Sequence, residues 1–507
     1  MKTPLILLLC AAMLLCLAGC GREEAPYTPT GDALDNSAPA TQPDASTPEE
    51  NSVFALAYYP DRSLNPFQAT DPTNRVLFSL LYQGLFAVDK NYQVVPMLCD
   101  TYNVSTDMKT YTFYLANAYF SDGTPITAND AAASLSAAKG SPWYGSRLQH
   151  VITISSYGTA VVLELDTPME NLPILLDIPI VKASEVNTAQ PLGTGPYRYS
   201  GESLRRQAGW WCSGELPIDA DTIPLVASQS PAQIRDDFEF RDVGLVCADP
   251  GRYDYVDFRS DHELWDCENG TLLYLVSHKE SKFFADPAVR AALTHAIDRD
   301  SLSEEYYHGF AQAACLPASP SSPYYNQSLA QRFGYAPQKF IDAITAAAPE
   351  SNKVTMLLCS DDLMRVRTGL AIEKMLESCG LDVNIVQVSS EDLVGYLLWS
   401  TYDLYLAQTK LSANMDISAF FGTNTSMNYG GLSDPALYAL SLESLANSGN
   451  FYNLHQQVME KGQLCPILFQ NYAVYANRGK LSDLAPARDN IFFYDIGRTM
   501  KDALIKE

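Results

Sequence analysis

"VTMLLCSDDLMRVRTGLAIEKMLESCGLDVNIVQVSSEDLVGYLLWSTYDLYLAQ" (354–408) contains three short apolar stretches of strand-like composition, at 354–359, 382–388 and 402–408. Short apolar runs between turn residues are typical of buried strands. The stretches between them are long enough for helices, so the order is β-α-β-α-β. That order predicts an α/β fold with a parallel sheet covered by helices.

Polar residues indicate where helices of this region begin. Ser360 or Asp361 is placed to cap the first helix, and Ser389 or Ser390 is placed to cap the second. Earlier in the chain, Asp286 precedes a proline and an apolar stripe at helical spacing. We predict a third helix start at that aspartate.

The N-terminal half also mixes strands and helices. We predict strands at 53–58, 109–115 and 160–166, where β-branched and aromatic residues are enriched. The apolar spacing in 74–86 predicts a helix. An Ala-rich helix should follow a cap at Asn129 or Asp130. The chain is too long for one core, which indicates two or three domains.

The first twenty residues have the pattern of a bacterial lipoprotein leader. Lys2 precedes an apolar run from Leu5 to Ala18, shorter than the roughly 20 residues that a membrane-spanning helix needs. The run ends in Leu-Ala-Gly-Cys, which resembles the lipobox, where the cysteine is lipidated and the leader is removed. We therefore predict a signal peptide at 1–19 and lipidation of Cys20. Two acyl chains would anchor the protein without spanning the membrane.

The next segment and the overall charge limit the partners. Residues 20–51 are rich in Pro, Thr, Ser, Asp and Glu, which predicts a disordered tether between the lipid and the folded body. The formal charge of the chain is −25. Such a chain repels nucleic acid and anionic headgroups, so we expect no nucleic-acid partner and membrane contact only through the lipid. The expected location is the extracytoplasmic face of the cell membrane.

Eight further cysteines are candidates for metal binding or disulfides. They lie at 99, 212, 247, 267, 315, 359, 379 and 465. They form no C-x-x-C pair and have no regular spacing, so we expect no zinc site and no other metal or cofactor. We predict that most are buried free thiols.

Several motifs occur in the order found in one protein family. They are "LNPF" (64–67), "LLYQGLFAVD" (80–89), "VVPMLCDTYNVSTDMKTYTFYL" (94–115), "SDGTPITAND" (121–130), "GTGPY" (193–197), "FADPAVRAALTHAIDRDSL" (284–302), "NYGGLSDPAL" (428–437) and "CPILF" (465–469). With these motifs the sequence resembles the family 5 solute-binding proteins, the receptors of bacterial ABC importers for oligopeptides, dipeptides and nickel. The resemblance covers nearly all of residues 53–500.

The resemblance implies a two-lobed fold of the periplasmic-binding-protein type (type II, cluster C-like). The base lobe would be discontinuous, at 52–85, 190–270 and 471–507. Residues 86–189 would form an extra subdomain on it, and 271–470 would form the second lobe. A peptide-like or other small polar ligand would bind between the lobes, and closure would make the shape that ABC permease subunits recognise. We expect a monomer without catalytic residues.

Two other functions stay open from the sequence. A secreted hydrolase is disfavoured, because the chain has no nucleophile elbow or Walker loop. His262 and Glu263 begin like a zinc-protease motif, but Asp266 stands where the second histidine is needed. A sensor or pheromone-type receptor on the same fold is the second alternative, since a fold does not determine a function.

Candidate ligand contacts come from both lobes. In the base lobe, the loop after the first strand offers Tyr59, Asn65, Asp71 and Asn74. In the second lobe, the polar candidates are Lys410, Asn414, Asn428 and Tyr429. Peptides, metal chelates, haem and glycosides are all ligands within the family that the resemblance implies.

Lys410 lies where peptide-binding members of the family have an acidic residue that pairs with the peptide ammonium. The stretch 407–421 has no acid before Asp416, which puts free peptides in doubt. A lysine that faces a closing cleft loses hydration, and an anion compensates for this loss. We therefore expect an anionic group on the ligand. The alternative is that Lys410 is a solvated loop residue.

Overall fold

The computed structural model describes residues 54–212, 220–399, 401–423, 425–479, 481 and 484–492. The predicted signal peptide, Cys20 and the tether lie outside these residues. Within them, no helix has the length and apolar character needed to cross a membrane.

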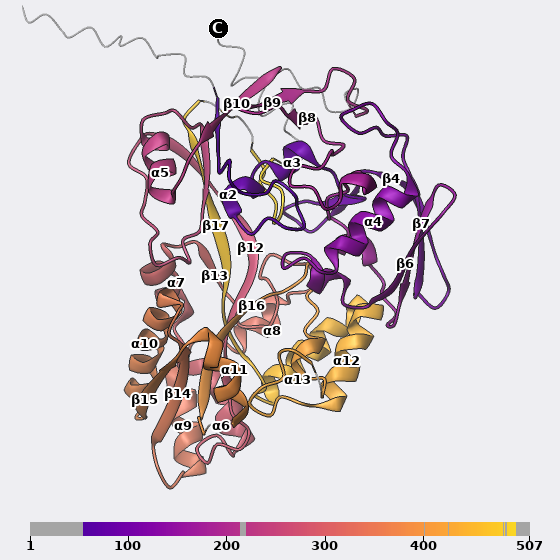
Figure 1. The fold of residues 1–507 in the computed structure, drawn as a ribbon. Coiled ribbons are helices and arrows are strands. Elements are labelled where there is room, and N and C mark those ends of the chain that lie inside the picture. Colours follow the sequence, from indigo (N-terminus) through magenta and orange to yellow (C-terminus); the bar gives the residue numbers. More distant parts are fainter. Residues whose placement is uncertain are drawn as a thin grey trace, which may run out of the picture. The chain divides into compact units, whose positions relative to one another are not determined.

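One mixed sheet organises the folded chain (Figure 1). Its neighbouring strands are, in order, β15 (Asp382–Val388), β14 (Lys353–Cys359), β16 (Leu404–Lys410), β12 (His262–Ser277), β17 (Cys465–Asn477), β11 (Leu245–Ala248), β1 (Leu56–Tyr58), β10 (Thr222–Ala227), β9 (Ser203–Arg206) and β8 (Tyr197–Tyr199). A further strand, β13 (Ala311–Ala313), pairs with β17 outside this path.

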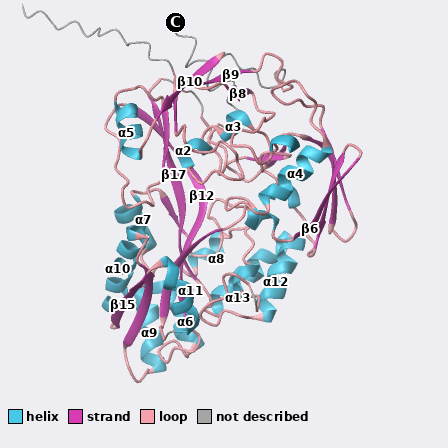
Figure 2. Ribbon diagram, in the orientation of Figure 1, coloured by secondary structure: helices cyan, strands magenta, loops and turns pink. Residues whose placement is uncertain are grey.

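The predicted β-α-β-α-β unit forms one end of this sheet. β14 pairs in parallel with both β15 and β16, and α10 (Leu363–Ser378) and α11 (Ser390–Trp399) make the connections. Figure 2 shows helices gathered around this end of the sheet. Apolar side chains of β14, β15 and α10 are buried together, which explains why the strand pattern was readable from sequence.

One predicted cap in this unit is wrong and one is confirmed. Asp362 caps α10, because its carboxylate accepts from the Arg365 N–H at 2.9 Å. Asp361 does not cap it, since its carboxylate accepts from the Ser390 N–H at 2.7 Å. The prediction at Ser389 holds, because its Oγ accepts from the Asp392 N–H at 3.2 Å.

Two long strands link the base-lobe strands to the second-lobe strands. β12 and β17 pair antiparallel from His262 opposite Asn477 to Leu275 opposite Cys465, with a bulge after Glu268. Gly270 lies in this bulge at φ +82°, a conformation that favours glycine. The antiparallel pair therefore passes through both halves of the sheet.

The base-lobe strands form the other end of the sheet. β1 pairs in parallel with β10 and β11, and α5 (Pro231–Glu239) lies between β10 and β11 in the chain. The predicted strand at 53–58 is confirmed only over Leu56–Tyr58, which form β1; Phe54 and Ala55 precede the strand, and residue 53 is outside the described residues.

The predicted helix over 74–86 is confirmed only in part, as two short helices that end at Leu81. The chain forms α2 (Pro72–Arg75) and α3 (Phe78–Leu81), then leaves helical geometry at Tyr82 and continues into β2 (Phe86–Val88). Gly84 passes so close to Ile178 that a Cβ would lie 3.0 Å from the Ile178 backbone nitrogen. Tertiary packing therefore overrides the helical spacing, although the apolar residues of this segment are buried.

The extra subdomain is built on antiparallel strands. β4 (Cys99–Val104), β5 (Thr110–Leu115), β7 (Ala160–Leu165) and β6 (Val151–Tyr157) form a four-stranded sheet, and β2 pairs with β3 (Val94–Pro96). The predicted strands at 109–115 and 160–166 are confirmed as β5 and β7.

The N-cap of the helix in this subdomain, α4 (Ala128–Ala138), lies two or three residues before the predicted position. Thr127 is the N-cap, and its hydroxyl accepts from the Asp130 N–H. Asp130 in turn accepts from the Thr127 N–H at 2.8 Å, so the two residues form a capping box. The prediction of Asn129 or Asp130 as the cap is therefore wrong, because Asp130 acts from the third helical position.

Short helices complete the second lobe. They are α6 (Pro287–Ala292), α7 (Arg299–Tyr307), α8 (Gln327–Gln331), α9 (Pro337–Ala347), α12 (Pro435–Ala446) and α13 (Phe451–Glu460). Across the residues that the structure describes, 3-10 helices lie at Gly145–Leu148, Leu172–Leu175 and Ala183–Glu185 in the N-terminal half, and at Leu293–Ala296, Ser418–Phe420 and Ser448–Asn450 in the second lobe. The predicted cap of α6 is confirmed, since Asp286 accepts from the Ala288 N–H at 2.8 Å.

The cysteines agree with the prediction of free thiols. In the part of the chain that the structure describes, Cys99, Cys247, Cys267, Cys315, Cys359, Cys379 and Cys465 are free, and most of them are buried. Burial raises the pKa of Cys247 to about 12, so that thiol stays protonated near neutrality.

Candidate functional site

Four basic side chains converge on one carboxylate where the base lobe, the extra subdomain and the second lobe meet. Arg147 forms an ion pair with Asp489, while Arg75 Nη2 and Lys410 Nζ each lie 3.5 Å from Asp489 Oδ1. Arg488 adds a fourth positive charge beside them. We call Arg75, Arg147, Lys410 and Arg488 the cation cluster.

These cations come from four separate segments. Arg75 ends α2, Arg147 lies in the 3-10 helix Gly145–Leu148, Lys410 ends β16, and Arg488 belongs to the C-terminal stretch. Lys410 is thus a strand residue that pairs with Thr271 of β12, rather than a residue of a free loop. Its side chain is 26% exposed.

The indole of Trp143 supports two of these cations. The Arg75 guanidinium carbon lies 3.9 Å from the centre of the Trp143 ring, and Lys410 Nζ lies 5.0 Å from it. The indole N–H donates to the Ala69 carbonyl at 2.8 Å, which fixes the ring. Cation–π contacts of this kind partly replace the lost hydration of the charges.

The charges in this region do not cancel. Burial alone would raise the pKa of Asp489, but Arg147, Lys410 and the other cations hold it well below its ordinary value. Burial, together with the neighbouring arginines, lowers the pKa of Lys410 to about 7, although Asp489 opposes this shift. Burial and Asp489 raise the pKa of Asp177 to about 6. Glu268 is a further carboxylate of this region, with Oε1 4.0 Å from Arg488 Nη1, so the four cationic groups face the three carboxylates of Asp489, Asp177 and Glu268.

Several buried polar atoms have no hydrogen-bond partner among the described residues, and three of them belong to the cation cluster. These three are Arg75 Nη1, Arg488 Nε and Arg488 Nη1, and the Asn414 side-chain oxygen is another. Buried polar groups are normally satisfied, so an unsatisfied set at one place points to a bound molecule or water. Asn414, one of the predicted ligand contacts, is therefore close to fully buried with a free acceptor.

A cavity of about 290 Å³ lies at the carboxyl ends of β1, β10 and β11. Two predicted residues, Tyr59 and Asp71, line it together with Asp249, Arg252 and Tyr472. Burial raises the pKa of Asp249, whose carboxylate accepts the Gly251 N–H at 2.9 Å. Ligands of open α/β sheets bind at this end of parallel strands.

A second cavity, of about 400 Å³, lies beside the first half of β12. Its lining includes Tyr92, Asp266, Glu268, Asn471 and Arg488. The carboxylate of Glu268 accepts hydrogen bonds from the hydroxyls of Tyr92 and Ser319, and burial raises its pKa. These two cavities therefore touch the long strands that join the lobes.

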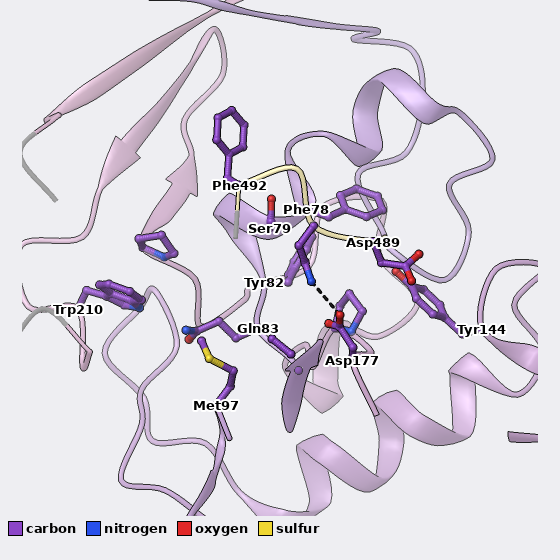
Figure 3. Close-up of a pocket in the computed structure, with 15 residues that line it drawn as sticks. Phe78, Ser79, Tyr82, Gln83, Met97, Tyr144, Asp177, Trp210, Asp489 and Phe492 are labelled. Carbon is purple, nitrogen blue, oxygen red and sulfur yellow. Dashed lines mark hydrogen bonds between the residues drawn. The ribbon is translucent and has the colours of Figure 1, made fainter. Parts of the chain in front are cut away.

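A third cavity beside Asp489 is too small for a solute. It measures about 60 Å³, and its lining includes Tyr82, Tyr144, Asp177 and Trp210 (Figure 3). Ligand pockets usually have volumes of about 300–1,000 Å³, so this one has room only for water.

The structure places two other predicted contacts in the scaffold. Asn65 donates to the carbonyls of Val186 and Thr188 at 2.8 and 2.7 Å. Asn74 accepts from the Tyr59 N–H at 2.8 Å and donates to the Tyr59 carbonyl at 3.1 Å. Their side chains are fully buried and hold backbone in place.

The remaining predicted contacts are also engaged within the chain. Asp71 caps α2 through its carboxylate and forms an ion pair with Arg62. Asn428 donates to the Gly422 carbonyl at 2.7 Å, and Tyr429 packs half-buried against the core. The structure therefore brings Tyr59 with Asp71 to one cavity and Lys410 to the cation cluster, while Asn428 and Tyr429 lie in neither. Ligand contact by these residues stays a prediction.

Sequence reasoning missed Arg75, Arg147, Arg488 and Asp489. No periodicity or motif marks these positions, because they are far apart in the chain and meet only through the fold. The available signal was weak: three of the four are cations in a chain that has few of them.

His150 makes a further contact between the extra subdomain and the second lobe. Its Nδ1 lies 2.9 Å from Asp166 Oδ1, and its Nε2 lies 3.0 Å from Asp416 Oδ2. Burial alone would lower the pKa of His150, but the two carboxylates raise it above its ordinary value. Asp416 is almost fully buried, and its pKa is lowered by His150 against the effect of burial. We call this contact the histidine clasp.

A shared sheet with two α/β ends, and a charged site where they meet, defines a receptor of the binding-protein class. The chain belongs to family 5 of the bacterial extracellular solute-binding proteins, because the model of the middle region of that family matches residues 93–431. The predicted family is thereby confirmed.

Relatives of known name agree with this assignment. The glutathione-binding protein GsiB of Pectobacterium atrosepticum is 26% identical over 286 residues, which cover 52% of this chain and 55% of that protein. GsiB of Escherichia coli strain K12 matches to the same extent. The chain thus spans about half the length of the curated relatives it matches. These relatives are named as binding proteins, not as enzymes.

Solved structures confirm the two-lobed α/β fold. The ABC transporter substrate binding protein CtaP of Listeria monocytogenes matches with a TM-score of 0.70 at 16% identity, over 88% of this chain and 98% of that chain. NikZ from Campylobacter jejuni in complex with Ni(L-His) matches with a TM-score of 0.62 at 15% identity, over 89% and 100% of the two chains.

Proposed function

We propose that this protein is the solute receptor of an ABC importer. It captures a small polar or peptide-like ligand between its lobes and delivers it to permease subunits in the membrane. It acts as a monomer and catalyses no reaction. The family membership and the names of the relatives support this proposal.

The cation cluster carries the proposal about the ligand. A strongly acidic chain has gathered Arg75, Arg147 and Lys410 with Arg488 at one buried place, next to the strands that join the lobes. Buried cations are costly unless an anion meets them. Asp489 supplies one carboxylate, and unsatisfied guanidinium N–H groups remain. The ligand therefore carries a carboxylate or another anionic group.

A relative supports this chemistry. GsiB is named as a glutathione-binding protein, and glutathione is a peptide-like molecule with two carboxylates. A ligand of that kind would place an anionic end at the cation cluster. Its remaining polar groups would then lie toward the cavity lined by Tyr59 and Asp249.

Membrane attachment completes the proposed function. Lipidation of Cys20 would hold the receptor at the extracytoplasmic face, and residues 20–51 would give it reach toward the permease. A sensor on the same fold is the second candidate. Loss of solute import on deletion of the gene favours transport, and unchanged import favours sensing.

Mass spectrometry of the molecule released from protein purified without refolding identifies the ligand. Calorimetric titration with that molecule then tests the role of Lys410. A partly buried charge-assisted contact contributes about 1.5–3 kcal/mol, so Lys410→Ala should weaken binding about ten- to a hundredfold. Lys410→Glu should weaken it further, because it reverses the charge.

Lys353→Ala is the matched control. Lys353 is exposed at the start of β14, at the opposite end of the parallel strands from Lys410. The affinity of the Lys353→Ala variant for the released ligand should equal that of the unaltered protein. Equal affinities for the Lys410 variants would remove the support for an anionic ligand. A released molecule that is consumed, at a rate abolished by one substitution, would contradict the receptor proposal.

A further inference from the structure

The C-terminal stretch 484–492, which we call the strap, touches every part of the fold around the cation cluster. Ala487 and Asn490 form an isolated antiparallel bridge, with hydrogen bonds of 2.9 and 3.1 Å between their backbones. Arg488 and Asp489 are therefore the two central residues of a tight turn. The turn presents one cation and one anion side by side.

Each side of the turn is attached to a different part of the chain. The Arg488 guanidinium donates to the Leu411 carbonyl just beyond β16, and Asp489 meets Lys410 at the end of the same strand. On the other side, the Asn490 amide donates to Asp177 at 2.8 Å. The strap thus connects the second lobe with the extra subdomain.

The long strands are shaped to receive Arg488. A Cβ on Gly270 would lie 2.0 Å from Arg488 Nη2 and 2.5 Å from its central guanidinium carbon. The guanidinium group therefore lies directly against the β12 backbone at the bulge. In addition, the Cys267 thiol lies 2.9 Å from the Ala487 carbonyl. The strap is seated on β12 at the place where the two lobes are joined.

Asp489 has the interactions that an anionic ligand group would make. Its carboxylate is buried and meets cations from the base lobe, the extra subdomain and the second lobe at once. These are the same cations that, under the proposed function, receive the anionic group of the solute. Two carboxylates cannot occupy one such position, because like charges at contact repel strongly.

We propose that the strap is an internal stand-in for the ligand. Without solute, the Asp489 carboxylate lies among the cations that would receive the anionic group of the solute, and the Arg488 guanidinium donates to the Leu411 carbonyl. These contacts hold the lobes together. An anionic solute binds by displacing the strap. This inference rests on the proposed function at one point, which is that the cation cluster binds the anionic group of the solute.

Displacement has a predictable effect on affinity. An internal competitor that is favoured tenfold weakens the apparent binding of any anion tenfold, since only the fraction with the strap displaced can bind. The strap therefore acts as a filter. It excludes simple anions and admits solutes that make further contacts in the cleft.

The test uses inorganic sulfate as the probe and Asp489→Asn as the variant. Asparagine has the same shape and lacks the charge, so it should leave the cation cluster open to an external anion. Calorimetric titration should show sulfate binding about tenfold or more tighter in this variant than in the unaltered protein. Asp261→Asn, which removes an exposed ion pair with Arg478, is the control and should not change it.

A second measurement needs no substitution. Hydrogen exchange of the full-length protein, with and without saturating sulfate, should show faster exchange of the strap amides at 487–490 when sulfate is bound. This measurement keeps the proposal testable if Asp489→Asn does not fold. Unchanged sulfate affinity in the variant, or strap amides that exchange no faster with sulfate, would overturn the strap proposal.

The two proposals fail separately. An import assay that shows no role in transport would overturn the receptor function and leave the sulfate and exchange results as they are. Conversely, a strap that sulfate does not displace would leave the receptor function in place and make Asp489 a permanent counter-ion.

Discussion

At the scale of single residues, the histidine clasp gives the molecule a dependence on pH. An imidazole that lies between two carboxylates can donate from both ring nitrogens only when it is protonated. The groups that face His150 are Asp166, Asp416 and the amide of Gln149. The contact therefore joins the extra subdomain to the second lobe through a charge that can be removed.

The raised pKa of His150 sets the direction of this dependence. A raised pKa in the folded state stabilises the protein fully below the unfolded value of about 6.5, and this gain is lost as the pH rises through the folded pKa. Asp416 has a lowered pKa, so its contribution to the stability of the folded state is lost as the pH falls through its folded pKa. The clasp is thus strongest in mildly acid solution.

We predict that His150→Gln lowers the free energy of unfolding by about 1.5–3 kcal/mol at pH 5.5, the range for a hydrogen bond between charged groups. The loss should be smaller at pH 8.5, because a smaller fraction of the imidazole is protonated at that pH. Urea unfolding at both values measures it. His308→Gln, at a half-exposed position, should change stability little at either pH. An equal loss at both values would exclude the role of protonation.

Residue-scale reasoning from the sequence reached part of the site. Lys410 stood out because it was a cation where relatives have an acid, and the structure places it in the cation cluster. Asn414 stood out as a polar residue, and it is buried with an unsatisfied oxygen. Arg147 and Asp489 could not be found, since their partners are hundreds of positions away in the chain.

At the scale of elements, α4 depends on its capping box. Thr127 and Asp130 satisfy each other's backbone N–H groups at the start of this helix, which packs inside the extra subdomain. The same helix presents Ser134 to the Val181 backbone, where the hydroxyl donates to the carbonyl at 3.1 Å. Its first turn therefore positions the segment that leads back to the base lobe.

Thr127→Ala should destabilise the protein by about 1 kcal/mol, the usual loss when a side-chain cap is removed. Thermal and urea unfolding both measure this change. The control is Thr124→Ala, because Thr124 bonds only within an exposed turn and its loss should stay within about 0.5 kcal/mol. If the two variants lose equal stability, the capping box does not contribute as the geometry indicates.

Elements with a uniform environment were predictable from sequence, and elements with a changing environment were not. β14 lies between β15 and β16 and is buried over most of its length, and the prediction of this strand held. β12 was missed because its environment changes along its length. Residues 262–268 are half-buried or exposed apart from the buried Cys267, whereas 272–277 are buried throughout. A strand that crosses from one environment to another has no single period.

At the scale of the whole molecule, the resemblance predicted the two-lobed fold, which no local pattern contains and which the solved structures confirm. The discontinuous bounds of the base lobe stay a prediction. The separation into base lobe, extra subdomain and second lobe depends on contacts between distant segments. The strap shows the limit clearly, since its sequence, "APARDN" (485–490), resembles an ordinary surface turn. Its role appears only when Gly270 and Lys410 are placed beside it.

Anchoring is a prediction at the same scale. Cys20→Ala should leave the leader uncleaved or release the protein from the membrane fraction, because no thioether lipid can form. Cys16→Ala is the matched control, since Cys16 lies within the leader and outside the lipobox. Fractionation with immunoblotting decides between the outcomes. Normal processing and full membrane retention of the Cys20 variant would contradict lipidation at this position.

The position of Trp143 between charges of the two lobes allows its fluorescence to report on their separation. The chain has five tryptophans, and the indole of this one has a guanidinium at 3.9 Å and an ammonium at 5.0 Å from its ring centre. Arg75 belongs to one lobe and Lys410 to the other, so separation of the lobes takes one charge from the ring and leaves the second. The emission colour of an indole depends on the field of nearby charges. Opening of the receptor should therefore shift the wavelength of tryptophan emission, which can be measured without an attached dye.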